Sequence, residues 1–179
     1  LDYRNDIFSK FKIPKRVGSN ELRPYQVEAV KAILYNKAGE LPFPIGGIKA
    51  ATNAGKTTMM AAIHIAVGRR TIMLLNDSDL FEQFRKEIPE LLPDTEIGFV
   101  QGNKSLENLK ADFVVAMVKT LSTNLKEITN ELADFDVCLV DEYDLADNFT
   151  YKSVLERLYN SSIRGGLSGT SFMGTLKKH

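Results

Sequence analysis

The chain has 179 residues, 44% hydrophobic and 26% charged, a composition typical of one globular domain with a sizeable core. Its 23 basic and 23 acidic residues cancel, so net charge gives no indication of a nucleic-acid partner. No apolar run reaches the roughly 20 residues of a membrane span, and no signal-peptide core is present. The single cysteine, Cys138, cannot form an internal disulfide. Together these observations predict an intracellular, cytoplasmic protein without membrane insertion.

The first predicted element is an amphipathic helix over residues 23–36. Its apolar residues recur at helical spacing, and Pro24 is acceptable in the first turn. The preceding residues, 1–21, are interpreted as a leader or linker, and a loop rich in glycine and proline is expected over 36–47. The main domain is therefore expected to span 22–179.

After this loop, β-rich runs alternate with helical ones, which is the order of an α/β domain. Several strands are apolar throughout, as expected where helices cover both faces of a parallel sheet. The expected strands are 47–52, 71–76, 95–102, 112–118, 136–142 and 163–169, and the expected helices begin near Lys56 and cover 78–88, 119–132 and 150–159. The pattern predicts a three-layer α/β/α sandwich with a mostly parallel central sheet and right-handed crossovers.

A phosphate-binding loop is predicted where the first of these strands leads into a helix. Gly55, Lys56 and Thr57 match the last three positions of the pattern GxxxxGK[ST] in the required strand-loop-helix context. Such a loop holds phosphates with backbone N–H groups, while the lysine reaches the terminal phosphates and the threonine hydroxyl binds Mg²⁺. Ala50 and Asn53 stand where glycine might be expected, and asparagine tolerates a left-handed backbone. The expected nucleotide-binding residues are Thr52, Asn53, Ala54, Gly55, Lys56, Thr57 and Thr58.

A second candidate feature is the acidic end of the run "VCLVDEYD". Asp141 and Glu142 follow a strand predicted to be buried, and ligands of open α/β sheets gather at the carboxyl ends of strands. An aspartate there can hold Mg²⁺, and a neighbouring glutamate can orient and deprotonate the attacking water. A solvated acidic turn is the alternative interpretation of these residues taken alone. Their pairing with a phosphate loop favours nucleotide hydrolysis.

Four motifs in order, "LRPYQ", "AATNAGKT", "DEYD" and "GLSGT", resemble those of superfamily 2 helicases and translocases. The first and last of them are most similar to the DNA-directed branch that includes UvsW-like helicases and the XPB and RecG type enzymes. The resemblance covers residues 22–170 and implies a P-loop NTPase fold, that of the first RecA-like domain. A second RecA-like domain of the same full-length chain would then complete the nucleotide site, so the present chain should hydrolyse ATP weakly on its own.

The resemblance also implies roles for individual residues. Gln26 would read adenine with its side-chain amide, with Arg23 and Tyr25 as weaker candidates beside it. The phosphate, metal and water-activating roles fall on Lys56, Thr57, Asp141 and Glu142. The motif that couples hydrolysis to movement would comprise Asp144, Ser168 and Thr170.

Two further stretches are similar to motifs that touch the nucleic-acid backbone in this superfamily. In "LLNDSDLFEQF" the candidate contacts are Asn76, Asp77 and Ser78, although Asn76 stands where proline is usual. In "VAMVKTLSTN" they are Lys119 and Thr120, for which a plain helix cap is an equally good interpretation. Amides, hydroxyls and helix N-termini can hold phosphates without basic excess, so zero net charge does not exclude such contacts.

The predicted function is that of an ATP- and Mg²⁺-dependent DNA helicase or translocase motor, acting on single-stranded, duplex or branched DNA in recombination or repair. Three alternatives stay open. The chain could be a nucleotide-dependent switch without strand separation, the translocase part of a restriction system, or an RNA helicase, which the first and last motifs disfavour. Fold-level kinship does not decide among them.

Overall fold

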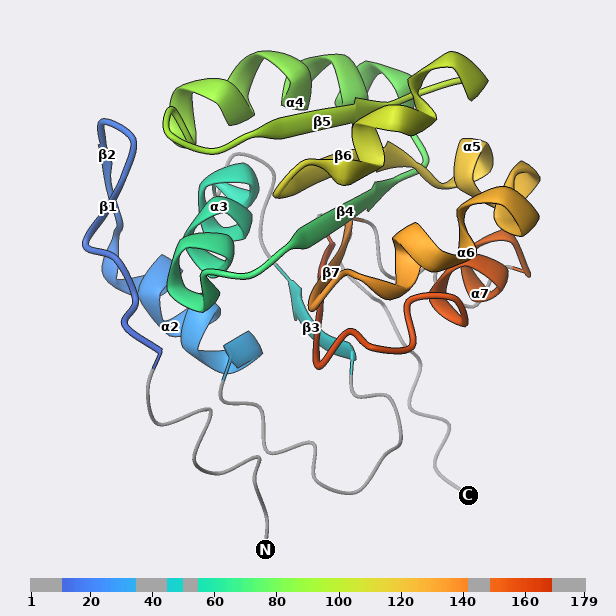
Figure 1. The fold of residues 1–179 in the computed structure, drawn as a ribbon. Helices are drawn as coiled ribbons and strands as arrows, with labels where there is room; N and C mark the ends of the chain where they lie inside the picture. Colours follow the sequence, from blue (N-terminus) through green and yellow to red (C-terminus); the bar gives the residue numbers. More distant parts are fainter. Residues whose placement is uncertain (1–10, 35–44, 50–54, 142–148, 169–179) are drawn as a thin grey trace, which may run out of the picture.

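The computed structural model describes residues 11–34, 45–49, 55–141 and 149–168. In this part of the chain, six parallel strands form one sheet in the order β3-β8-β7-β4-β6-β5. Figure 1 shows this sheet between helices on both sides. The strands are β3 (Ile45–Lys49), β4 (Thr71–Leu75), β5 (Ile97–Val100), β6 (Phe113–Met117), β7 (Val137–Asp141) and β8 (Ile163–Ser168). The predicted three-layer α/β fold with a mostly parallel central sheet is confirmed.

Helices cover both faces of the sheet and give the molecule two apolar cores. One core lies under α2 (Pro24–Leu34), α3 (Lys56–Val67) and α4 (Ser78–Leu91). The other lies under α5 (Val118–Thr123), α6 (Leu125–Ala133), α7 (Phe149–Leu155) and the 3-10 helix η1 (Asn103–Lys110). Successive residues of a strand point to opposite cores, so both sets of side chains must be apolar, which explains the continuous hydrophobic runs. None of the helices in the described ranges has the length and apolar character that crossing a bilayer requires.

A short hairpin precedes α2 and packs on the same face of the sheet (Figure 1). It consists of β1 (Arg16–Val17) and β2 (Asn20–Glu21). Val17 is fully buried in the core formed with α2, α3 and α4. The part of the predicted leader that the structure describes is therefore attached to the domain by buried apolar surface.

Several predicted boundaries differ from those observed. The loop expected over 36–47 is shorter at its end, because β3 begins at Ile45. The helix expected over 119–132 is two helices, α5 and α6, that meet at Asn124, whose side-chain amide donates to the Thr120 carbonyl at 2.7 Å. The helix expected to reach residue 159 ends at Leu155. A side chain that bonds to the backbone competes with helical hydrogen bonds, which explains the break at Asn124.

The edge strand β5 is covered by η1. The Asn108 side-chain amide donates to the Phe99 carbonyl at 2.9 Å. The η1 backbone approaches β5 so closely that a Cβ atom at Gly98 would collide with the Asn108 carbonyl oxygen. Only glycine permits this approach of the two backbones.

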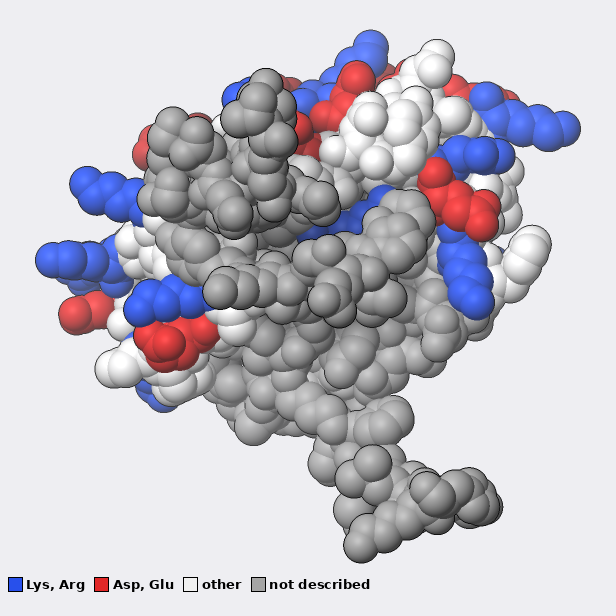
Figure 2. All heavy atoms as spheres, turned by 90° about the horizontal axis from the view of Figure 1, so that it is seen from below, with Lys and Arg blue, Asp and Glu red and all other residues white. Residues whose placement is uncertain are grey.

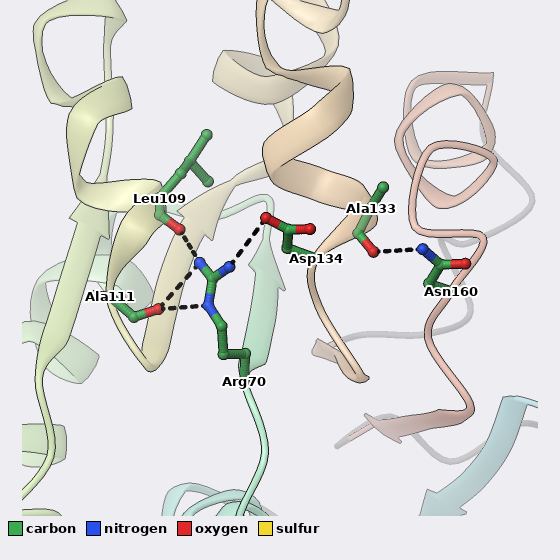
Figure 3. Close-up of polar contacts among 6 residues, drawn as sticks. All are labelled: Arg70, Leu109, Ala111, Ala133, Asp134 and Asn160. Atoms are coloured by element: carbon green, nitrogen blue, oxygen red, sulfur yellow. Dashed lines mark hydrogen bonds and ion pairs between the residues drawn. The ribbon is translucent and has the colours of Figure 1, made fainter.

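Arg70 joins three elements at the amino-terminal edge of the sheet, just before β4 (Figure 3). Its Nη2 donates to the Leu109 carbonyl at 2.5 Å and to the Ala111 carbonyl at 3.4 Å. Its Nη1 lies 3.6 Å from Asp134 Oδ2, and its guanidinium stacks over the Phe135 ring at 4.6 Å. These contacts fix the segments that lead into β6 and β7.

Two further side chains bond to helix-end carbonyls at the same edge. The Asn160 amide donates to the Ala133 carbonyl at 2.9 Å, at the end of α6 (Figure 3). The buried Arg164 guanidinium on β8 donates to the carbonyls of Leu158 at 2.7 Å and Leu155 at 3.3 Å. The Leu155 and Leu158 carbonyls also accept backbone N–H groups, from Leu158 at 3.2 Å and from Ser161 at 3.0 Å, so Arg164 adds a second hydrogen bond to each.

Candidate nucleotide site

Two residues far apart in the sequence meet at the carboxyl-terminal edge of the sheet. Lys56 is the first residue of α3 and Asp141 the last of β7. Lys56 Nζ lies 3.9 Å from Asp141 Oδ1, and the Asp141 residue is 3% exposed. A buried carboxylate is costly unless a cation or ligand compensates it, so this pair is the strongest indication of a functional site.

Gly55 holds the turn that leads into α3. Its backbone has φ 74° and ψ 44°, the left-handed conformation that most other residues disfavour. A Cβ atom at this position would also collide with Nε2 of Gln26. Glycine is therefore required at Gly55 both by backbone conformation and by the approach of another helix.

Gln26 is buried in the first turn of α2, next to Gly55. Its Oε1 accepts a hydrogen bond from the Arg23 backbone N–H at 2.9 Å, which is half of a capping box. The cap fixes the amide relative to the start of the helix. Arg23 is exposed and Tyr25 is 46% exposed, so these two weaker candidates lie on the surface beside the buried glutamine.

The chemistry of the described side chains fits a magnesium-bound nucleoside triphosphate. The Thr57 hydroxyl, which is buried, and the Asp141 carboxylate are oxygen ligands of the kind that Mg²⁺ prefers. The Lys56 ammonium and the N-terminus of α3 suit phosphate, and Thr58 is partly buried one residue further along α3. Ser168, fully buried, ends β8 directly beside β7. The other predicted residues lie outside the described ranges, namely Thr52, Asn53, Ala54, Glu142, Asp144 and Thr170.

The predicted nucleic-acid contacts lie at the same edge of the sheet. Asn76 to Ser78 follow β4, while Lys119 and Thr120 follow its neighbour β6. Asn76, Ser78 and Lys119 are exposed. Asp77 instead caps α4, since its Oδ1 accepts from the Leu80 N–H at 2.8 Å. These positions remain a prediction, with Asp77 already engaged within the domain.

Thr120 takes part in hydrogen bonds between the start of η1 and helix α5 that the sequence motifs did not indicate. Its hydroxyl oxygen accepts a hydrogen bond from the Gly102 N–H at 3.0 Å. One turn further on, the Asn124 amide donates to Asn103 Oδ1 at 3.0 Å. Two asparagines and a glycine in "QGN" and "STN" are turn-forming residues, but only the fold shows that the two turns meet.

Comparison with known proteins identifies the family. Residues 19–173 match the family described as type III restriction enzyme, res subunit (ResIII). The chain belongs to this family. ResIII membership and the fold together confirm the resemblance to superfamily 2: the chain is a RecA-like, nucleotide-binding motor domain of the helicase and translocase type.

Individual relatives are more distant. The ResIII chain is 28% identical over 170 residues to the DNA 3'-5' translocase XPB2 of Sulfurisphaera tokodaii, an alignment that covers 95% of this chain and 35% of the relative. The chain therefore spans about a third of the length of this curated relative.

Two solved structures share the fold. The UvsW helicase of bacteriophage T4 superposes with a TM-score of 0.66 at 20% identity, covering 93% of this chain and 59% of that one. The Sulfolobus solfataricus SWI2/SNF2 ATPase core in complex with dsDNA gives a TM-score of 0.69 at 18% identity, covering 92% and 36%.

Proposed function

We propose that this domain couples Mg²⁺-dependent ATP hydrolysis to movement along DNA, in a protein that translocates on or remodels duplex or branched DNA. The observation that carries the proposal is the close approach of Lys56 to the buried Asp141 at the carboxyl edge. That arrangement places a phosphate-binding cation beside a metal-binding carboxylate. The relative from Sulfurisphaera tokodaii is named a DNA 3'-5' translocase, which supports DNA over RNA as the track.

The roles follow from the chemistry of each side chain. Lys56 binds the terminal phosphates, and Thr57 with Asp141 would hold Mg²⁺, which supplies compensation of phosphate charge when bound. Glu142, the next residue along the chain, accepts the proton of the attacking water. Gln26 contacts the base from the start of α2. A coupling motif at Asp144, Ser168 and Thr170 passes the state of the site to a second RecA-like domain of the full-length protein.

The proposed DNA surface is formed by the residues that follow β4 and β6. Exposed Asn76, Ser78 and Lys119 offer an amide, a hydroxyl and an ammonium to phosphate oxygens. On the face seen in Figure 2, basic and acidic side chains are interspersed over the described surface. A sparse set of backbone contacts suits a motor that must step along DNA of any sequence.

The test is steady-state ATP hydrolysis by the full-length natural protein, alone and with single-stranded, duplex or forked DNA or with RNA. We expect DNA to stimulate hydrolysis and Lys56→Ala to abolish it, while Lys86→Ala, at an exposed lysine on α4, leaves it unchanged. Nucleotide binding without stimulation by any nucleic acid would instead indicate a switch, and stimulation by RNA alone would indicate an RNA helicase.

A second candidate is the translocase part of a restriction system, favoured by the matched family, whose description is the res subunit of a type III restriction enzyme. The same motor would then be linked to a nuclease. Incubating the full-length protein with unmodified plasmid DNA and ATP distinguishes the two, because only the restriction system cleaves the DNA.

A further inference from the structure

Helix α2 rests on the domain through one face that touches two glycines. Gln26, Val30 and Ile33 are spaced four and three residues apart, so they share this face, and all three are buried. At its first turn the face meets Gly55, where a Cβ atom would collide with Gln26 Nε2. Two turns later it meets Gly165 on β8, through Ile33.

The contact at Gly165 leaves no room for a side chain. A Cβ atom there would lie 2.9 Å from Ile33 Cγ2, 3.1 Å from Ile33 Cδ1 and 3.3 Å from Leu139 Cδ2. Gly165 is not among the glycines with positive φ, so its backbone conformation does not explain the choice of residue. The close approach of α2 does explain it. Isoleucine is stiff at χ1, so a methyl group at position 165 would push the helix rather than only rotate the Ile33 side chain.

Displacing α2 also displaces the Gln26 amide. The amide is bonded to the start of its own helix through the Arg23 N–H at 2.9 Å. It therefore moves with the helix as one body, and its distance from the phosphate loop depends on how deeply the helix sits on the sheet. Small shifts in a packed interior are transmitted because the interior has few voids.

We propose that Gly165 is a positioning residue for nucleotide binding. By admitting Ile33 to the surface of β8, it sets the depth of α2 and so holds Gln26 at the loop that carries Gly55 and Lys56. The inference rests on the proposed function, in which Gln26 contacts the nucleotide. The same contact joins α2, which carries the proposed base-binding residue Gln26, to β8, the strand that ends at the expected coupling residue Ser168.

The experiment measures the affinity of the full-length protein for a fluorescent ATP analogue by equilibrium titration. Gly165→Ala is expected to weaken binding roughly tenfold, within the usual range for coupled sites. Adding Ile33→Ala removes both clashing carbon atoms and should restore affinity to near the wild-type value. Gln26→Ala should weaken binding by itself, and Gly165→Ala should then have little further effect. Ile33→Phe, which enlarges the helix side of the same contact, should reproduce the loss if Gly165→Ala folds poorly.

The control is Val114→Ala, at a buried residue of the opposite core, which lowers stability without touching α2. Unchanged ATP affinity in Gly165→Ala, or a loss of the same size with and without Gln26, would overturn the positioning role and leave Gly165 as a packing residue. That result would spare the proposed function, provided that Lys56→Ala and Gln26→Ala still weaken binding. A wild-type protein that binds no ATP would overturn both.

Discussion

The two edges of the same sheet use polar side chains in opposite ways. At the amino-terminal edge, Arg70, Asn160 and Arg164 donate to backbone carbonyls at the ends of η1, α6 and α7. At the carboxyl-terminal edge, Lys56 and Asp141 face each other, and their groups are of the kind that bind phosphate and metal. The contrast shows that burial of a charge does not by itself indicate function. A buried charge that bonds to backbone carbonyls has a structural role, whereas one that faces an opposite charge at the carboxyl-terminal edge is a candidate for ligand binding.

The largest expected effect tests the carboxyl edge. Asp141→Asn keeps the volume of the side chain but removes the anionic oxygen ligand, so ATP hydrolysis by the full-length protein should fall by roughly 100-fold or more. Steady-state kinetics check this, with cooperative urea unfolding showing that the variant is folded. Asp94→Asn, at an exposed aspartate in the turn after α4, is the matched control, and its turnover should stay the same. Undiminished hydrolysis in Asp141→Asn would remove Asp141 from the site.

The next prediction tests the amino edge. Arg164→Met removes two charge-assisted hydrogen bonds to the Leu155 and Leu158 carbonyls, so the free energy of unfolding should fall by roughly 2–4 kcal/mol. Urea unfolding of the domain measures this, and nucleotide affinity should be unchanged. Arg157→Met, at an exposed arginine beyond α7, should have little effect on stability. A loss of ATP binding without a loss of stability would contradict the division between the two edges.

Arg70 should show a smaller effect of the same kind. Arg70→Ala removes the bonds to Leu109 and Ala111 and the stacking on Phe135, at an expected cost of about 1–2 kcal/mol. The cost is lower than for Arg164 because the Arg70 side chain is partly exposed. Thermal or urea unfolding measures it, with Arg69→Ala at the exposed neighbour as the control. Equal stabilities of the Arg70 and Arg69 variants would show that the contacts of Arg70 do not contribute to the stability of the domain.

The smallest effect concerns pH. His64 is buried at the end of α3, its Nδ1 lies 2.9 Å from Thr71 Oγ1, and burial lowers its pKa from the usual 6.5. The unfolded chain therefore binds a proton more readily than the folded one. The contribution of His64 to the free energy of unfolding should be fully present above pH 6.5. It should decline as the pH falls toward the lower pKa of the folded state, by at most about 1.4 kcal/mol per pH unit. Urea unfolding between pH 7 and 5.5 tests this, since His64→Gln should reduce the slope and an unchanged slope would exclude His64 as its source.

The carboxyl edge was predictable from sequence because its signals are local. Gly55 to Thr57 form a motif, Asp141 ends an apolar run, and parallel topology brings such strand ends to one edge. The structure places Lys56 beside Asp141 at that edge, and Ser168 ends the neighbouring strand β8. The roles of these residues and the nucleic-acid contacts stay predictions.

The amino edge was not predictable because its signals are long-range. Arg70 and Arg164 look like ordinary surface arginines until the fold brings helix ends beside them. The same holds for the hairpin, whose strands of two residues show no periodicity and whose stability comes from burying Val17. Asn124 ended a predicted helix because its side chain bonds to the backbone, a competition that periodicity does not reveal.

The cover that η1 forms over β5 has a consequence for self-association. An open edge strand offers free backbone groups to any similar strand in solution and so promotes aggregation. Here the Asn108 amide occupies the Phe99 carbonyl, and the η1 backbone lies against Gly98. Replacing Gly98 with a residue that has a side chain would displace η1 and expose the backbone groups of β5. Gly98 thus permits a cover that leaves this edge less open to pairing with another strand.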